Sequence, residues 1–191
     1  MWPFHVSLGP LAIAPGELFV LLGFGIVVVL ARPRVLALGV DKGGLFDLAL
    51  AALAGGAVGA RLFYFLPLWF RGLKDGTALF SQWSEGSGIY GGLLGGCAAV
   101  AFLARLRKQP VLDILDAGAA PFPLGFAAGK IGCFLAGCCY GRRCDGFPGV
   151  AFRPGSLAHL TQVEQGRIPA NAAAAHPVQP SQLYELAFGA L

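Results

Sequence analysis

Long apolar runs alternate with short polar stretches along this chain. A helix needs about 20 mostly apolar residues to cross a bilayer, and runs of that kind lie at about residues 11–31, 45–70, 86–106 and 111–137. Pro121 and Pro123 interrupt the last run, so we expect it to bend or partly unwind there. A further apolar helix is predicted from Ser181, but the sequence ends at Leu191. That is about half a span, and it predicts a C-terminally truncated chain.

The composition supports a membrane location. Of 191 residues, 56% are hydrophobic and only 13% are charged, and the mean hydropathy of +0.68 exceeds that of soluble domains. We therefore predict an all-α fold, a polytopic membrane helix bundle that forms a single transmembrane domain over residues 1–191. The polar residues 147–178 are predicted to form an irregular extracytoplasmic segment. The net charge of +4 suits anionic lipid headgroups, so we expect a lipid bilayer as partner and no nucleic acid.

The distribution of basic residues predicts the orientation. No lysine or arginine precedes the first run, whereas basic residues follow the first and third runs: Arg32, Arg34, Lys42, Arg105, Arg107 and Lys108. Loops rich in lysine and arginine stay in the cytoplasm. This predicts a multi-pass protein with its N-terminus outside, and it puts the end of the fourth run near the outer surface.

Two apolar runs contain unusual polar residues. Arg61 lies within the second run, where facing lipid would cost about 2.5 to 3.5 kcal/mol, so we expect it to face the bundle interior, a polar cavity or the interface. The third run opens with "SGIYGGLLGG", residues 87–96, whose glycines four apart favour close helix packing. Tyr90 in this stretch is either an interfacial residue or a polar group of a site.

The stretch "GKIGCFLAGCCYGRRCDG", residues 129–146, concentrates the chemistry of the chain. Its cysteines are spaced C-x4-C-C-x4-C, which is not a standard zinc pattern, so we assign no metal ligand. The cysteines are Cys133, Cys138, Cys139 and Cys144. Disulfides or reactive thiolates remain open, and the neighbouring Lys130, Arg142 and Arg143 suit a phosphate group. The residues alone favour a lipid-headgroup site and a cysteine-based redox or metal site equally.

The stretch "GKIGCFLAGCCYGR" resembles the signature of the prolipoprotein diacylglyceryl transferases, bacterial membrane enzymes that lipidate a cysteine. Other segments resemble that family in the same order: "GARLFY" around Arg61, "GSGIYGGLLGG", "DAGAAPFPLGFAAGK" and "QPSQLYE" at residues 179–185. The resemblance covers nearly the whole chain, and several collinear segments are more specific than any one.

The resemblance implies an enzyme of the bacterial cytoplasmic (inner) membrane that needs no cofactor. Its members transfer a diacylglyceryl group from phosphatidylglycerol to the lipobox cysteine of a prolipoprotein signal peptide, releasing glycerol phosphate and leaving a thioether. By position, Lys130 matches the phospholipid-binding arginine of the family signature. Gly141 and Arg142 match the end of that signature, and Arg61 lies in another matching segment, so these residues are the candidates for substrate binding.

The chain departs from the family at catalytic positions. Tyr90 occupies the place of a functional histidine, Cys133 replaces an asparagine and Cys138 replaces a glutamate. The family's catalytic arginine and glutamate in the next helix would lie beyond Leu191. We therefore expect a divergent, cysteine-bearing branch in which Tyr90 aligns the substrate, Glu185 is the candidate proton acceptor, and Cys133 or Cys138 is a candidate covalent nucleophile.

An alternative of another class remains open from the sequence. On the same scaffold, the four clustered cysteines would make a membrane thiol-redox or metal-binding protein. The transferase interpretation depends on the phosphate-binding cations, and the alternative depends on the thiols.

Overall fold

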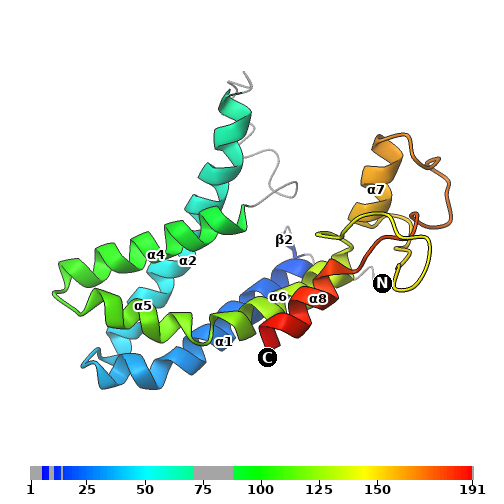
Figure 1. Cartoon of the computed structure of the whole chain (residues 1–191). Helices are drawn as coiled ribbons and strands as arrows, with labels where there is room; N and C mark the ends of the chain where they lie inside the picture. Colours follow the sequence, from blue (N-terminus) through cyan, green and yellow to red (C-terminus); the bar gives the residue numbers. More distant parts are fainter. Residues whose placement is uncertain (1–5, 9–10, 14, 71–87, 191) are drawn as a thin grey trace. The chain divides into compact units, whose positions relative to one another are not determined.

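The computed structural model of the chain describes residues 6–8, 11–13, 15–70 and 88–190 (Figure 1). It divides into two compact units, residues 1–30 with 121–191 and residues 31–120. We call the first the signature unit and the second the glycine unit.

Helices dominate the described residues, which confirms the predicted all-α class. They are α1 (Pro15–Ala37), α2 (Lys42–Phe70), α4 (Ile89–Leu106), α5 (Val111–Ala119), α6 (Phe122–Ala136), α7 (Leu157–Glu164) and α8 (Ser181–Ala190). The first helix begins later than expected, because residues Leu11–Ile13 form strand β2 and pair antiparallel with β1, Val6–Leu8. Proline is favoured at the first position of a helix, and α1 begins at Pro15.

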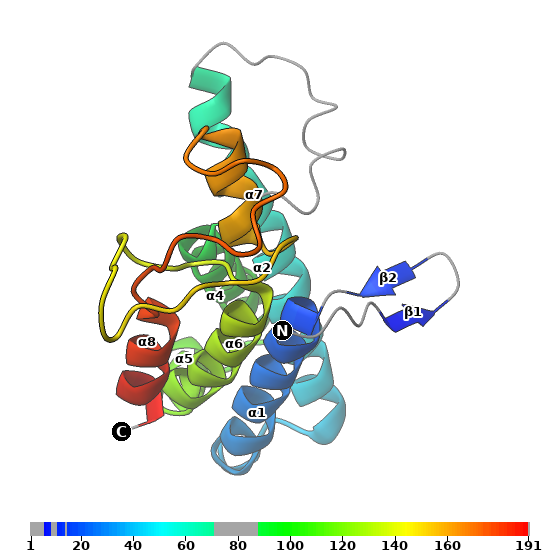
Figure 2. The same cartoon turned by 90° about the vertical axis from the view of Figure 1, so that its right-hand side faces the viewer.

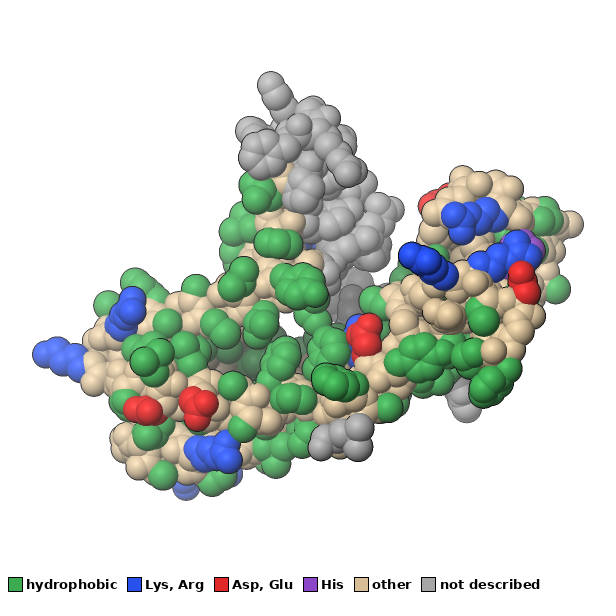
Figure 3. Space-filling view, viewed as in Figure 1, with side chains coloured by type: hydrophobic (Ala, Val, Ile, Leu, Met, Phe, Trp, Pro, Cys, Tyr) green, Lys and Arg blue, Asp and Glu red, His purple; other side chains and the backbone are tan. Residues whose placement is uncertain are grey.

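Three of these helices are long and apolar enough to cross a membrane: Leu18–Ala37, Lys42–Phe63 and Ile89–Leu106. The pair α5 and α6 qualifies as another span, with a bend of 48° between Ala119 and Phe122. This confirms the predicted break, since Pro121 precedes α6 and Pro123 lies in its first turn. Large apolar side chains stay exposed on the helices, as Figure 3 shows. Such surfaces need a lipid covering, and the chain is a multi-pass membrane protein.

Glycines allow α2 and α4 to pack closely within the glycine unit. A Cβ added at Gly59 or Gly95 would overlap the backbone of the facing helix, at Gly91 and Gly55 respectively. The glycine spacing therefore serves backbone contact, as expected for small residues between membrane helices. An ion pair also connects Asp47, near the start of α2, with Arg107, directly after the end of α4.

In the signature unit, α6 packs against both α1 and α8. Gly23 of α1 faces Gly125 of α6 so closely that neither position has room for a Cβ. On α8, a Cβ at Gly189 would lie 2.8 Å from the carbonyl oxygen of Pro123. Figures 1 and 2 both show α8 running beside α6. Helix α8 thereby brings the "QPSQLYE" segment to the signature stretch.

The segment between α6 and α8 is ordered around one buried aromatic ring. Phe152 is 1% exposed, and its ring centroid lies 5.8 Å from that of Phe134 and 6.5 Å from that of Tyr140. Isolated bridges pair Val178 with Val150 and with Arg143. The segment is mostly irregular, as predicted, but the prediction missed α7. Ser156 caps this helix by accepting a hydrogen bond from the N–H of His159 at 3.2 Å.

Candidate functional site

The signature stretch turns back on itself at the end of α6. Gly137 takes a left-handed conformation, with φ 69°, as is usual for the residue that ends a helix. The N–H of Cys138 then donates to the carbonyl of Cys133 at 3.1 Å. This reversal brings the residues after the helix beside its last turn.

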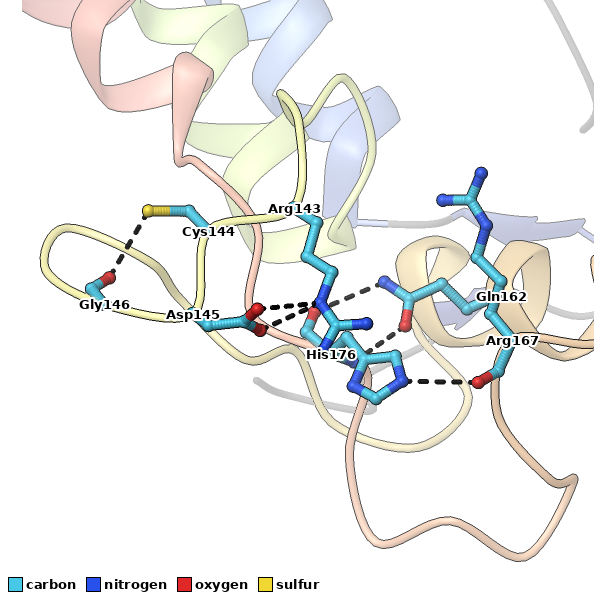
Figure 4. Close-up of polar contacts among 7 residues, drawn as sticks. All are labelled: Arg143, Cys144, Asp145, Gly146, Gln162, Arg167 and His176. Atoms are coloured by element: carbon cyan, nitrogen blue, oxygen red, sulfur yellow. Dashed lines mark hydrogen bonds and ion pairs between the residues drawn. The ribbon is translucent and has the colours of Figure 1, made fainter.

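The turn gathers three thiols. The sulfur atoms of Cys133, Cys138 and Cys139 all lie within 4.8 Å of one another. Cys139 also has a positive φ of 56°, which is uncommon for a residue with a side chain. Cys144 is not in this group; Figure 4 shows its thiol directed at the carbonyl of Gly146, at 3.4 Å.

The thiols after the helix differ in acidity. Hydrogen bonds from Cys133 and then Cys138 lower the pKa of the Cys139 thiol well below its usual range. The pKa of the Cys138 thiol is raised, first by its hydrogen bond with Cys133, then by that with Cys139 and by burial. The thiolate is the reactive form of cysteine, and the hydrogen bonds among these thiols favour it at Cys139 over Cys138.

The "QPSQLYE" segment is hydrogen bonded to the signature stretch. The N–H of Gly141 donates to the carbonyl of Gln179, and the N–H of Gln179 donates to the carbonyl of Arg142, both at 2.9 Å. A Cβ on Gly141 would lie 3.0 Å from the Cβ of Gln179. This close approach favours glycine at position 141.

Two side chains of α8 hold the cysteine turn. The hydroxyl of Ser181 donates to the carbonyl of Cys139 at 2.6 Å, and the amide of Gln182 donates to the carbonyl of Cys138 at 2.5 Å. Gln182 is fully buried, and among the described groups its amide oxygen has no hydrogen-bond partner. That oxygen is an acceptor within the site.

An ion pair completes the site. The ammonium of Lys130 contacts the carboxylate of Glu185 and lies 4.8 Å from the centroid of the Phe126 ring, a cation–π distance. The Lys130 side chain is 11% exposed and the Glu185 side chain 43%. The cation is thus nearly enclosed, and its partner reaches the surface.

The structure brings together many of the residues predicted from the sequence. Lys130, Cys133, Cys138, Gly141 and Glu185 all belong to the signature unit and lie in or beside this turn. The side chain of Arg142 is exposed there, with its backbone joined to Gln179.

The other predicted site residues belong to the glycine unit. Arg61 is partly buried on α2, and Tyr90 is 71% exposed in the first turn of α4. Their participation in a common site stays a prediction.

Three residues that contribute to the site were not predicted from the sequence. Ser181 and Gln182 position the cysteine turn, and Phe126 contacts Lys130. Ser181 and Gln182 lie within the family-like segment "QPSQLYE", but this position does not indicate which residues they contact. Phe126 lies four residues before Lys130, a spacing that places both on one helix face.

The site combines an enclosed cation, an acceptor and clustered thiols at the end of an apolar helix. Its cation suits a phosphate group, and its thiols suit nucleophilic or metal chemistry. Residues 3–191 match the prolipoprotein diacylglyceryl transferase family. The chain belongs to this family. The resemblance of the signature stretch to the diacylglyceryl transferases is thereby confirmed.

Relatives with assigned names show the extent of the match to the diacylglyceryl transferases. The phosphatidylglycerol–prolipoprotein diacylglyceryl transferase of Stenotrophomonas maltophilia (strain R551-3) is 36% identical over 96% of this chain and 65% of its own length. The enzyme of the same name from Xylella fastidiosa (strain 9a5c) is 34% identical over 87% of this chain and 56% of its own length. The enzyme of the same name from Pseudoalteromonas atlantica (strain T6c / ATCC BAA-1087) is 35% identical over 97% of this chain and 60% of its own length. The chain therefore spans only part of the length of these relatives.

Proposed function

We propose that this protein transfers a diacylglyceryl group from phosphatidylglycerol to the lipobox cysteine of a prolipoprotein signal peptide. The observation that carries this proposal is that the signature stretch contacts the "QPSQLYE" segment. Backbone hydrogen bonds join the two segments, and Lys130 of the first forms an ion pair with Glu185 of the second. Family membership and the names of the relatives support the reaction.

The proposed reaction is displacement at a glyceryl carbon. The acceptor sulfur forms a bond to that carbon while the carbon–oxygen bond to phosphate breaks, and the electron pair leaves with glycerol phosphate. The acceptor thiol gives its proton to a base, and the product is a thioether. Catalysis then needs a cation at the phosphate and a nearby proton acceptor.

Lys130 and Glu185 suit these two tasks. A phosphate bound at Lys130 competes with Glu185 for the ammonium, because both partners are anions. Phosphate binding thus releases the carboxylate, which then accepts the proton of the acceptor thiol. Arg142 and Arg61 are proposed as further phosphate contacts, Gly141 as the close backbone contact of the turn, and Tyr90 as an aligning group.

A rival assignment within the same reaction gives Cys133 or Cys138 the role of first nucleophile. The cysteine sulfur would displace the phosphate and hold the diacylglyceryl group as a thioether. Transfer to the acceptor would then need displacement of a thiolate, so the cysteine must be a competent leaving group. Mass spectrometry of the protein after exposure to phosphatidylglycerol alone distinguishes the two, since only the rival leaves a diacylglyceryl adduct.

The proposed location is the bacterial cytoplasmic membrane, with the N-terminus outside and the residues from Gly137 to Pro180 at the outer surface. Both substrates are amphipathic or carry an apolar segment, so a site at the end of an apolar helix suits them. The basic residues around the ends of the first and third spans support this orientation.

The test uses the full-length protein in lipid, phosphatidylglycerol labelled in its headgroup glycerol, and a lipobox peptide. Labelled glycerol phosphate should appear only when the peptide is present. Lys130→Met should lower its release about a hundredfold, the scale on which loss of one aligned charge contact lowers a rate, whereas Lys130→Arg should keep most of it.

Lys42→Met is the matched control, because Lys42 is exposed at the start of α2 in the glycine unit. It should leave the release unchanged. Absence of peptide-dependent release from the unmodified protein would refute the transferase. An unchanged rate in Lys130→Met would refute the assignment of the phosphate to this ammonium.

A further inference from the structure

The separations among the three grouped thiols are close to those of metal ligands. In a tetrahedral site with zinc–sulfur bonds of about 2.3 Å, neighbouring sulfurs are about 3.8 Å apart. The sulfurs of Cys133, Cys138 and Cys139 lie within 4.8 Å of one another. Small side-chain rotations therefore suffice to bring all three onto one ion.

The backbone fixes this arrangement before any ion binds. The left-handed Gly137 and the left-handed Cys139 reverse the chain so that Cys138 and Cys139 lie beside Cys133. A left-handed residue other than glycine persists only where its surroundings hold it, often at a functional site. Ser181 and Gln182 supply that hold through the carbonyls of Cys139 and Cys138. Supporting hydrogen bonds of this kind orient metal ligands.

The surrounding charge also suits a bound cation with thiolates. Three thiolates around a divalent ion carry one net negative charge, and a monovalent ion leaves two. Lys130 lies one helical turn before Cys133, and its ammonium interacts electrostatically with Cys133 and Cys139. Lys130 therefore adds a positive charge beside a metal–thiolate centre, while it also pairs with Glu185.

The ligand set selects the class of metal. Thiolates prefer soft or borderline-soft ions, Cu⁺ and Zn²⁺, over Mg²⁺ or Ca²⁺, which take oxygen ligands. We propose that Cys133, Cys138 and Cys139 form a three-thiolate site for a thiophilic d¹⁰ metal ion, Zn²⁺ or Cu⁺. This site does not depend on the proposed transferase reaction, and each can be refuted without the other.

The experiment measures metal content of the full-length protein, purified in detergent with a reducing agent and without a histidine tag. The unmodified protein should retain Zn²⁺ or Cu⁺ by mass spectrometry of the elements, at a single ion per chain. Loading with Co²⁺ should give sulfur-to-cobalt charge-transfer absorption in the near ultraviolet. Replacement of all three grouped cysteines by serine should abolish both signals.

The chain offers its own control, because Cys97 and Cys144 lie outside the group. The double variant with Cys97→Ser and Cys144→Ser should bind metal as the unmodified protein does. The single variants Cys133→Ser, Cys138→Ser and Cys139→Ser keep the test decisive if the triple variant misfolds. Loss of a contact that only supports a ligand lowers metal affinity by about ten- to hundredfold. Each single variant loses a ligand itself and should lower the metal affinity by more than that. Its gel-filtration profile should stay unchanged.

Separate titrations with Zn²⁺ and with Cu⁺, each against a competing chelator, identify the ion. Tighter binding of either ion to the unmodified protein than to the three single variants supports the site. Equal binding of both ions to the unmodified and triple-serine proteins overturns it, as does loss of binding only in the Cys97 and Cys144 double variant. Glycerol phosphate release by the same preparations reports separately on the transferase.

Discussion

At the residue scale, the ion pair between Lys130 and Glu185 has unequal partners. Lys130 is 11% exposed and Glu185 43%, so water solvates the carboxylate much better than the ammonium. Leaving an enclosed charge without its partner costs more free energy than leaving an exposed charge without one. The two ends of the pair should therefore respond differently to substitution.

We predict that Glu185→Gln lowers the free energy of unfolding by about 1 to 2 kcal/mol, because it leaves the enclosed ammonium without a charged partner. Lys130→Met keeps the apolar stem and removes the charge, so it should cost less than about 1 kcal/mol. Reversible unfolding in mixed micelles measures both. Glu164→Gln, at an exposed position of α7, is the control. It should change the free energy of unfolding by less than about 0.5 kcal/mol. A larger loss in Lys130→Met than in Glu185→Gln would contradict the argument.

The sequence identified both members of this pair but not their contact. Lys130 was found because the signature stretch carries a cation at that position, and Glu185 because it closes a family-like segment. Nothing in a single sequence shows that residues so far apart meet, since the contact depends on α8 packing beside α6. The same holds for the thiols: spacing alone did not separate Cys144 from the grouped Cys133, Cys138 and Cys139.

At the element scale, the packing of α2 against α4 depends on individual glycines rather than on glycine content. A Cβ at Gly95 would overlap the carbonyl of Gly55 and lie 2.8 Å from the Cα of Gly59. At Gly92 the nearest atoms are 3.5 Å and 3.6 Å away, which is ordinary contact. Position 92 therefore has room for a methyl group, whereas position 95 of the same helix does not.

Gly95→Ala should destabilise the protein by about 1 to 3 kcal/mol, the usual cost of overpacking. Gly92→Ala removes the same flexibility without overlap, and because alanine is favoured over glycine in helices by about 1 kcal/mol, it should be neutral or stabilising. Detergent unfolding of the two variants side by side measures the difference. Equal destabilisation by both would contradict the argument, because only the Cβ at position 95 overlaps the facing backbone.

Helix α7 depends on its first residues. The hydroxyl of Ser156 accepts from the N–H of His159 and donates to the carbonyl of Arg153 at 2.7 Å. Ser156→Ala should destabilise α7 by about 1 kcal/mol, and hydrogen exchange at residues 157–164 should accelerate. Ser156→Thr keeps the hydroxyl and should exchange nearly as the unmodified protein does. Unchanged exchange in Ser156→Ala would show that packing around Phe152 alone holds this helix.

These elements also mark how far the sequence pattern predicts the fold. The apolar runs predicted the long helices, and Pro121 and Pro123 predicted the 48° break, because both signals are local. The hairpin of β1 and β2 and the helix α7 were missed. Their residues lack a long periodic pattern, and α7 is held by contacts with Phe152 and its neighbours that no local pattern records.

At the scale of the whole molecule, membrane orientation links the units to function. The signature unit carries the thiols, the ion pair and the segment before α8. We propose that the acceptor cysteine reaches the site from the outer side of the cytoplasmic membrane, so the proposed reaction needs the turn after α6 on that side. Counting spans from the N-terminus, this requires an outside N-terminus and a cytoplasmic loop between α4 and α5.

We predict that single cysteines introduced at Ser7 and Gln165 react with a membrane-impermeant thiol reagent in intact cells, and that one at Lys108 reacts only after permeabilisation. The variants are made in a background in which all five native cysteines are replaced by serine, so that only the introduced thiol is labelled. Ser7 lies in β1, Gln165 directly follows α7, and Lys108 follows α4 at an exposed position. The physical reason is the absence of basic residues before α1 and their presence after α4, which keeps the latter loop in the cytoplasm. Labelling of Lys108 alone in intact cells would reverse the orientation and remove the turn after α6 from the side where the acceptor cysteine arrives.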